Sequence, residues 1–171
     1  MLLDPEDLSG GQPASEEVDA SSPDAEVDAG GLPDGAVVWP VNGHAYLVVA
    51  RGRSILWETA KEEAAAMGGH LATIGSAEEN EFVFQLARSN DEAWNGLWGG
   101  PYLGGFRSAD GGRFDTGWEW VTGEPWSYTA WASGEPTADD SEIYLQLNER
   151  SRPVWNNINT GAANSFVVEF E

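Results

Sequence analysis

The segment from Trp94 to Trp155 is dominated by tryptophan and glycine. It holds seven of the nine tryptophans of the chain and few residues that favour helices. Aromatic and β-branched runs alternate there with glycine- and proline-containing turns, which is typical of short strands joined by loops. This half of the chain therefore predicts strands and loops, without the regular strand–helix alternation of a parallel sheet.

Period-two alternation and β-branched runs predict six strands over the whole chain. They cover residues 44–49, 70–74, 101–106, 118–121, 142–147 and 165–170. A loop of about twenty residues separates the fourth of these strands from the fifth, and long structureless loops inside a compact domain are usually functional. We expect this loop to carry the ligand-binding chemistry.

A first helix is predicted over residues 55–67, where the apolar residues keep roughly helical spacing. Ser54 precedes it and has a side chain suited to capping the helix. Gly68 and Gly69 follow it and predict its end, because glycine commonly terminates helices.

A second helix is predicted to begin at Ser76. Ser76 and Glu79 form the S-x-x-E pattern of a capping box, in which two side chains satisfy free backbone N–H groups. The apolar residues of this helix are Phe82, Val83, Leu86 and Ala87. Two short helices followed by several strands indicate an α+β protein.

Residues 1–35 differ in composition from the remainder. They carry ten acidic residues and no basic one, lack aromatic residues, and consist mainly of Asp, Glu, Ala, Ser, Pro and Gly. Such a segment cannot bury enough apolar surface to offset the entropy of ordering. We predict a disordered acidic tail or linker over 1–35, either a spacer or an interaction tail, and one folded domain over 36–171.

The net charge of −21 excludes nucleic acid as a partner, since phosphate backbones bind surfaces rich in Lys and Arg. The chain has no cysteine, so disulfides and thiolate metal sites are excluded. No stretch approaches 18 apolar residues, so no membrane insertion is expected. The start MLLDPEDL lacks the basic and apolar regions of a signal peptide.

Several motifs, taken in order, resemble the C-type lectin-like domain family over residues 39–171. In the helical half these are W-x-x-A at 57–60, GGHLATI at 68–74 and S-x-x-E-N at 76–80. In the second half these are GWEWVTGEP at 117–125, Y-x-x-W at 128–131, GEP at 134–136, WN at 155–156 and FVVE at 166–169. The resemblance implies two short helices packed on small antiparallel sheets, with a long ligand-binding loop.

Members of this family commonly carry two disulfides, and this chain is a disulfide-free version. The matching positions are Ala64 with Val168 and Tyr144 with Thr160. Packing must replace the stabilisation that the disulfides give, and the tryptophans are the obvious source. Cysteine-free versions resemble bacterial members, and the resemblance implies a protein that is secreted or on the cell surface.

The resemblance also implies a calcium site in the long loop. Glu135, Pro136, Glu142 and Asn156 match the positions of that site, while Thr137 stands where an amide or acid is expected and Asn157 where an aspartate is expected. Calcium prefers six to eight oxygen ligands from carboxylates and carbonyls. The implied metal site is therefore Glu135, Thr137, Glu142, Asn156 and Asn157, with calcium affinity weakened by the two departures and a cis peptide bond expected at Pro136.

In the family, sugar hydroxyls bind at this calcium. The implied partner is a carbohydrate or cell-surface glycan, held by Glu135, Thr137, Glu142 and Asn156, with Trp126 and Tyr128 as candidates for an exposed stacking face. A calcium-independent domain that binds protein or peptide through the same loop face is the alternative. No catalytic residues are predicted, because no nucleophile–base set or nucleotide-binding motif is present.

Two further acids of the loop, Asp139 and Asp140, are more typical of a solvated turn than of a metal site. Acidic residues among small residues usually keep an exposed turn in water, so these two are not assigned to the site. Either one is a candidate to swing in and restore the charge that Asn157 lacks.

Overall fold

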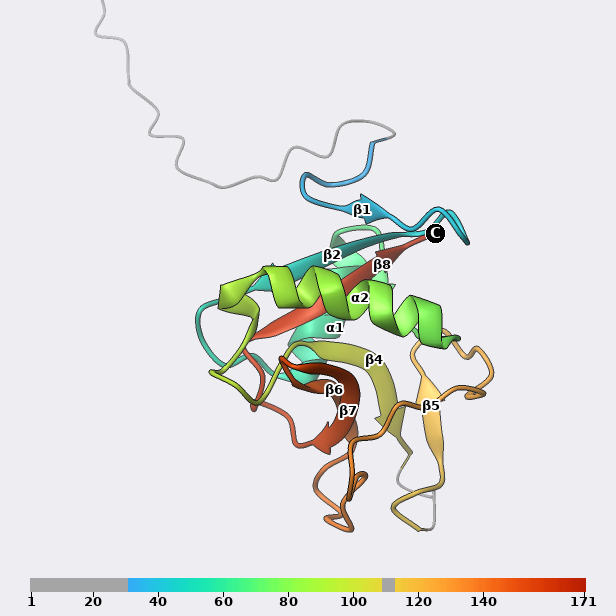
Figure 1. The fold of residues 1–171 in the computed structure, drawn as a ribbon, viewed down its shortest axis with the longest axis vertical. Helices are drawn as coiled ribbons and strands as arrows, with labels where there is room; N and C mark the ends of the chain where they lie inside the picture. Colours follow the sequence, from blue (N-terminus) through green and yellow to red (C-terminus); the bar gives the residue numbers. More distant parts are fainter. Residues whose placement is uncertain (1–30, 109–112) are drawn as a thin grey trace, which may run out of the picture.

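The computed structural model describes residues 31–108 and 113–171, and the ribbon is drawn in Figure 1. Its elements are β1 (Val37–Val38), β2 (Ala45–Ala50), α1 (Trp57–Ala66), β3 (His70–Leu71), α2 (Ala77–Ser89), the 3-10 turn η1 (Asp91–Ala93), β4 (Tyr102–Arg107), β5 (Trp118–Trp120), β6 (Tyr144–Glu149), β7 (Arg152–Ile158) and β8 (Ser165–Phe170). The predicted α+β class with two short helices is confirmed. Of the predicted tail, residues 1–30 lie outside the described residues.

The strands form one sheet with the order β1-β2-β8-β4-β6-β7, in which β3 also pairs with β8 and β5 with β4. The pairings are antiparallel, as predicted, apart from a single parallel contact between Tyr102 of β4 and Phe166 of β8. This contact joins two antiparallel groups, with β2 and β8 in one and β4, β6 and β7 in the other (Figure 1).

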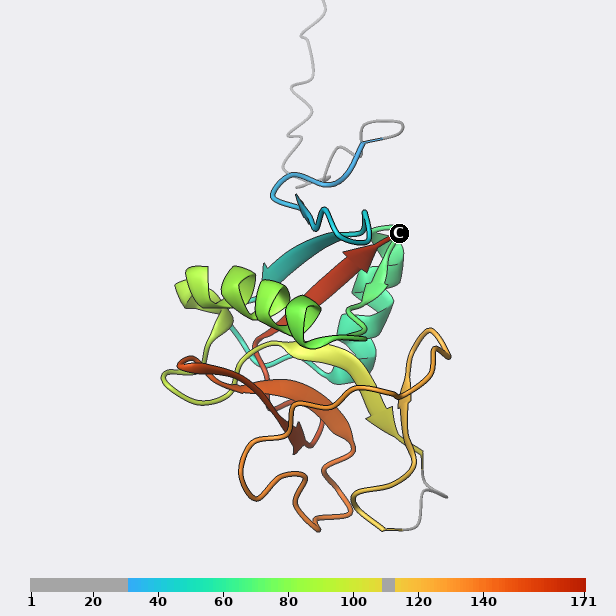
Figure 2. The same ribbon diagram turned by 45° about the vertical axis from the view of Figure 1, so that its right-hand side comes forward.

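The helices lie on opposite faces of the β2–β8 pair, as Figure 2 shows. Alternating residues of these strands face each helix, because neighbouring side chains of a strand point to opposite faces. Tyr46 and Val167 pack in one cluster with residues of α2, while Ala45 and Val168 pack in the other with residues of α1. The tryptophan-rich half extends the cluster on the α2 side.

The start of α1 differs from the sequence prediction. Ser54 does not cap it; the helix begins at Trp57, and Leu56 at the N-cap offers no side-chain bond. The backbone N–H of Trp57 instead donates to the hydroxyl of Thr160 at 3.1 Å. A side chain 103 positions away thus does the work of a local cap, which no local pattern can reveal.

The end of α1 confirms the predicted glycine stop. Gly68 has φ +85°, a left-handed conformation that suits glycine at a helix end. Gly69 has a different task, since a Cβ atom there would lie 2.3 Å from the carbonyl oxygen of Glu169 on β8. One glycine ends the helix, and the next lets the chain approach the sheet.

The capping box of α2 is confirmed in its first half. The Ser76 hydroxyl accepts from the backbone N–H of Glu79 at 3.1 Å. The Glu79 carboxylate accepts from the N–H of Gly75 at 2.6 Å and from the Tyr46 hydroxyl at 2.5 Å, so it also fixes the helix to β2.

The positions matched to disulfides are joined by packing and by hydrogen bonds. Ala64 of α1 and Val168 of β8 are fully buried in one core cluster. Tyr144 and Thr160 both donate to the carboxylate of Glu58, the latter at 2.8 Å. Among residues 31–108 and 113–171, no helix has the length and apolar character needed to cross a membrane.

Candidate functional site

The long loop runs from β5 to β6 and is held against β7. Residues 130–132 lie beside Trp155, whose N–H donates to the carbonyl of Ala130 and whose carbonyl accepts from the N–H of Ala132, both at 2.8 Å. In Figure 1 the part of this loop that leads into β6 lies below β4, β6 and β7, at the end of the molecule away from α2, whereas the part that follows β5 runs higher on the right. These backbone bonds fix the part of the loop that leads into Glu135.

Trp126 and Tyr128 lie on the core side of the loop. Trp126 packs against four other tryptophan rings with centroid distances from 4.4 to 6.3 Å; these are Trp118, Trp120, Trp131 and Trp155. Tyr128 meets Trp155 edge to face at 5.5 Å. Both side chains are therefore only partly exposed, in contrast to the exposed stacking face expected from the sequence. Their ligand-binding role stays a prediction.

Thr137 is the point at which the predicted site residues converge. Its backbone N–H lies 3.1 Å from Oε2 of Glu135 and 2.7 Å from Oδ1 of Asn157. Its hydroxyl donates to Oε2 of Glu142. Oxygens from three separate places in the sequence thus surround one small residue. The expected cis peptide bond between Glu135 and Pro136 is present.

Asn157 is buried and holds the loop together. Its Nδ2 donates to the carbonyls of Thr137 and Glu142 at 3.1 and 3.0 Å, while its Oδ1 accepts from the N–H of Thr137. The hydroxyl of Thr137 also lies 3.4 Å from this Oδ1. Whether it ligates a metal stays a prediction, because its amide has a complete structural role without one.

The side-chain oxygen of Asn156 is available to ligate a cation. Its Nδ2 donates to the carbonyl of Asn157 at 3.1 Å, but its Oδ1 is buried and has no hydrogen-bond partner within the described residues. Gln146, which faces Asn156 across the β6–β7 ladder, has an amide oxygen in the same condition. A buried acceptor without a partner is costly, and a bound ion or water relieves that cost.

The two carboxylates of the site repel each other. Partial burial raises the pKa of Glu135, the N–H of Thr137 opposes this, and the negative charge of Glu142 raises the pKa further. A cation between the carboxylates would favour their charged forms. In the described part of the chain, no three acidic, cysteine or histidine side chains form a metal-binding group.

Asp139 and Asp140 make hydrogen bonds away from the predicted metal site. Asp139 accepts from the N–H and hydroxyl of Ser141 at 2.9 and 2.7 Å, which closes a local turn and lowers the pKa of its carboxyl. Asp140 accepts from the guanidinium of Arg107 at 3.1 Å. Arg107 is buried on β4, and this bond connects the loop to that strand.

The comparisons with known proteins agree on one family. The model of the lectin C-type domain matches residues 53–170. Ladderlectin of Oncorhynchus mykiss is 30% identical over 122 residues, which cover 71% of this chain and 58% of ladderlectin. The chain spans about half the length of the curated relatives it matches.

Solved structures show the same fold. The C-type carbohydrate-recognition domain of cow CD23, solved with an oligosaccharide, is 22% identical with a TM-score of 0.63, over 80% of this chain and 93% of that chain. A calcium-independent type II antifreeze protein is 21% identical with a TM-score of 0.63, over 80% and 92%.

Proposed function

This chain belongs to the lectin C-type domain family, and from that premise we propose that it is a carbohydrate-binding module without enzymatic activity, which acts outside the cell and binds sugar through its long loop. Calcium is the proposed cofactor, held by Glu135, Glu142, Asn156 and Asn157, with the hydroxyl oxygen of Thr137 as a further donor. The proposed partner is a carbohydrate or cell-surface glycan.

The observation that carries this proposal is the convergence on Thr137. Two carboxylates and one amide oxygen lie within hydrogen-bonding distance of this residue, although they come from positions 135, 142 and 157. The buried Oδ1 of Asn156, without a partner in the described residues, adds a fourth oxygen on the neighbouring position of β7. Oxygen donors with two negative charges suit calcium. When bound, calcium supplies open coordination positions for adjacent sugar hydroxyls.

Thr137 itself limits the affinity. Its N–H and O–H groups already satisfy Glu135 and Glu142, so a cation must compete with bonds that hold the loop. The site also lacks the third negative charge that an aspartate at 157 would give. We therefore expect a dissociation constant for calcium of about 10⁻⁴ to 10⁻³ M, the range of weak extracellular sites.

Carbohydrate is proposed as the ligand because the relatives with this fold include a domain solved with an oligosaccharide. The matched carboxylates and amides supply acceptors and donors for hydroxyl groups. The alternative is a calcium-independent domain that binds protein or peptide through the same face. The hydrogen bonds that close around Thr137 without a metal are compatible with this alternative, and a calcium-independent antifreeze protein shares the fold.

Calorimetric titration with calcium chloride tests the metal site. The natural protein should bind with millimolar or sub-millimolar affinity, and the double variant Glu135→Gln, Glu142→Gln should show no heat of binding. Glu124→Gln is the matched control, because it removes one charge from an exposed position of the same loop whose carboxylate accepts from Thr122 and not from the site residues. Absence of binding in the natural protein at roughly 10 mM calcium would remove calcium from the proposal.

A glycan array with and without a chelator then tests the ligand. Signal that disappears with chelator and in the double variant supports calcium-dependent sugar binding. Glycan signal that survives the chelator keeps the sugar but removes the calcium. Binding confined to protein or peptide ligands supports the alternative.

A further inference from the structure

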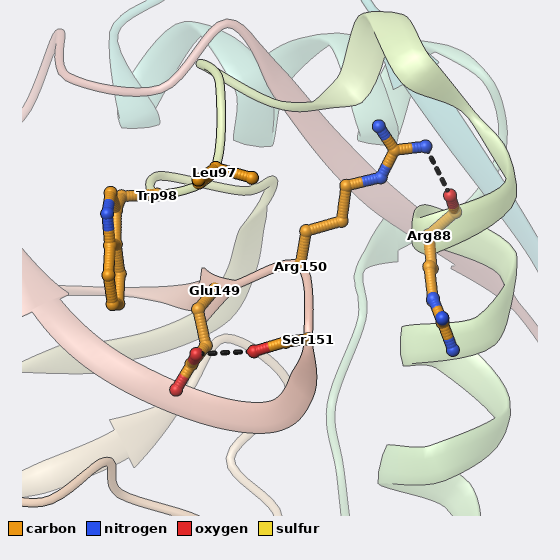
Figure 3. A pocket seen from close by; sticks show the side chains of 6 residues that line it. All are labelled: Arg88, Leu97, Trp98, Glu149, Arg150 and Ser151. Carbon is orange, nitrogen blue, oxygen red and sulfur yellow. Dashed lines mark hydrogen bonds between the residues drawn. The ribbon is translucent and has the colours of Figure 1, made fainter.

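A pocket lies away from the predicted calcium site of the long loop. It has a volume of about 460 Å³ and is lined by Arg88, Leu97, Trp98, Glu149, Arg150 and Ser151 (Figure 3). These residues come from the end of α2, the segment after η1 and the turn between β6 and β7. The volume falls within the range of about 300–1,000 Å³ typical of ligand pockets. None of the lining residues belongs to the proposed calcium site.

Trp98 is the exposed aromatic residue of this pocket. All nine tryptophans lie in the described part of the chain, and Trp98, with 62% of its surface accessible, is the one that is exposed. No ring contact to Trp98 occurs among residues 31–108 and 113–171, in contrast to the four tryptophan rings packed around Trp126. An indole face without a protein partner is available to a ligand.

The backbone of the Trp98 segment is held in place. The N–H of Gly99 donates to the carbonyl of Asn148, and the N–H of Gly100 to that of Leu147, both at 2.9 Å. A Cβ atom on Gly100 would lie 2.7 Å from the ring of Trp94, so glycine is required for this close packing. Trp98 therefore stands on a segment fixed to β6, which reduces the entropy lost when a ligand binds.

Basic residues gather at the same pocket. Arg88 and Arg150 line it, and Arg152 follows Ser151 in the chain; these are three of only eight Lys and Arg residues in a chain of net charge −21. Arg150 donates to the carbonyl of Arg88 at 2.9 Å and to Asp91, and Arg152 pairs with Glu149. The guanidinium of Arg88 has no ion-pair partner within the described residues. The pocket thus offers one uncompensated positive charge.

We propose that this pocket binds a sugar ring that carries a carboxylate. Trp98 stands at one side of the pocket and Arg88 at the other, with Glu149 and Ser151 between them (Figure 3). The C–H face of a pyranose packs on the indole, and the guanidinium of Arg88 pairs with the carboxylate through charge-assisted hydrogen bonds. The hydroxyl of Ser151, which donates to Glu149 at 2.6 Å, lies where ring hydroxyls would meet it. This site needs no calcium and does not depend on the function proposed for the long loop.

Trigalacturonic acid is the probe, and its methyl ester, with the same rings but no charge, is the matched ligand control. Tryptophan fluorescence quenched by acrylamide reports on Trp98, because quenching acts on exposed rings. We expect the acid to protect the fluorescence in the presence of a chelator. Trp98→Ala should remove both the part of the quenching that the ligand protects and binding by calorimetry. Arg88→Gln should weaken binding about tenfold or more, as for loss of a charged hydrogen bond.

Two control variants separate this site from others. Arg53→Gln removes an exposed arginine elsewhere and should leave binding unchanged. Glu135→Gln, Glu142→Gln should also leave it unchanged, which distinguishes this pocket from the long loop. Trp98→Phe keeps a smaller ring and should retain part of the affinity, which shows that loss in the alanine variant does not come from misfolding.

Several results would overturn the proposal. Equal binding of the methyl ester would show that the carboxylate is not recognised. Loss of binding in the Glu135, Glu142 double variant would assign the ligand to the long loop. Protection by triglutamate but not by trigalacturonic acid would identify an acidic peptide as the partner. Absence of protection at about 10 mM trigalacturonic acid would leave no sugar site here.

Discussion

The hydroxyl groups of Tyr144 and Thr160 donate to the two oxygens of a single carboxylate, that of Glu58. Tyr144 also stacks on Trp57 with ring centroids 4.6 Å apart. Burial and the bond to Glu58 raise the pKa of Tyr144 to about 12, so its hydroxyl remains a donor at neutral pH. This network connects β6, α1 and the segment before β8 at the place where the family resemblance puts a disulfide.

Glu58→Gln should therefore destabilise the protein in a pH-dependent way. Partial burial raises the pKa of Glu58, but the hydrogen bonds from Tyr144, the backbone and Thr160 outweigh this and hold the pKa below its ordinary value. A depressed carboxyl pKa stabilises the fold above the ordinary pKa, and the stabilisation is lost as pH falls through the folded-state value. We expect a loss of about 0.5–1 kcal/mol at neutral pH, discounted because Glu58 is exposed.

Urea titration of both proteins measures this difference. It should shrink as the pH falls through the lowered folded-state pKa of Glu58, because below that pH the carboxyl is protonated in both states. Glu62→Gln on the exposed face of α1 is the matched control. A loss in the Glu58 variant no greater than in this control would contradict the network.

Thr137→Asn should strengthen calcium binding. The substitution replaces the hydroxyl that donates to Glu142 with an amide whose oxygen is a calcium ligand. We expect affinity to rise about tenfold, equivalent to roughly 1.4 kcal/mol. Calorimetry with Thr129→Asn, the same change at an exposed loop position, provides the comparison. Unchanged affinity in the Thr137 variant would show that this position does not limit the site.

His44 should make stability decrease as the pH rises through neutrality. Its Nδ1 lies 2.7 Å from the buried carboxylate of Glu169, and this hydrogen bond raises the pKa of His44 more than burial lowers it, with further support from the charges of Glu171 and Glu79. A raised histidine pKa gives stabilisation that is complete below the unfolded pKa of about 6.5 and is lost as pH rises through the folded value.

His44→Gln should remove most of that pH dependence. We expect a loss of about 1–2 kcal/mol at about pH 6 and a smaller loss at about pH 8, because the charged bond is present mainly at the lower pH. Thermal melts across this range measure it, with His70→Gln for comparison, since His70 Nδ1 lies 4.0 Å from the same carboxylate. Parallel pH profiles for the natural protein and the His44 variant would refute the assignment.

Gly104→Ala should be among the most damaging small substitutions. A Cβ atom at this position of β4 would lie 2.5 Å from the carbonyl oxygen of Leu71 and 2.9 Å from the side chain of Val121. Backbone cannot yield easily, so we expect a loss of about 3 kcal/mol or more. Gly75→Ala is the control, since its nearest contact would be Glu79 at an ordinary 3.5 Å. Similar denaturant midpoints for the two variants would contradict this prediction.

Deletion of residues 1–30 should leave the melting temperature nearly unchanged. These residues are acidic and poor in large apolar side chains, so they have little surface to bury. The first described turn, in which the N–H of Ala36 donates to the carbonyl of Pro33 at 3.0 Å, remains in the shortened chain. A fall of several degrees would show that the acidic segment packs on the domain.

Local patterns in the sequence predicted the elements well where the cause was local. The S-x-x-E pattern placed the start of α2, glycine placed the end of α1, and alternation placed β6 and β8 within about two residues. The strand β7 lies outside the strands predicted from residue pattern, because Pro153 and two asparagines disfavour a strand. Its pairing with β6 overrides that preference.

The candidate site was also predicted only in part. The resemblance selected Glu135, Thr137, Glu142, Asn156 and Asn157, and the structure brings all but Asn156 into direct hydrogen-bond contact around Thr137. The resemblance did not show that Asn157 holds the loop, or that Trp126 packs inside a cluster of tryptophans. No binding role was predicted for the exposed Trp98, because sequence alone does not distinguish an exposed tryptophan from a core one.

The sequence by itself determined the α+β class, the family, the absence of disulfides and the residues that match the family's calcium positions. These depend on residue type and on short spacing, which the chain carries before it folds. Tertiary structure alone decided which side chains already have hydrogen-bond partners. Thr160 caps α1, Arg107 donates to Asp140, and the hydroxyl of Thr137 donates to Glu142, a carboxylate that calcium would need. The physical reason is that each of these partners lies close only after loop closure, and hydrogen bonds and burial act over a few ångströms of space whatever the separation in sequence.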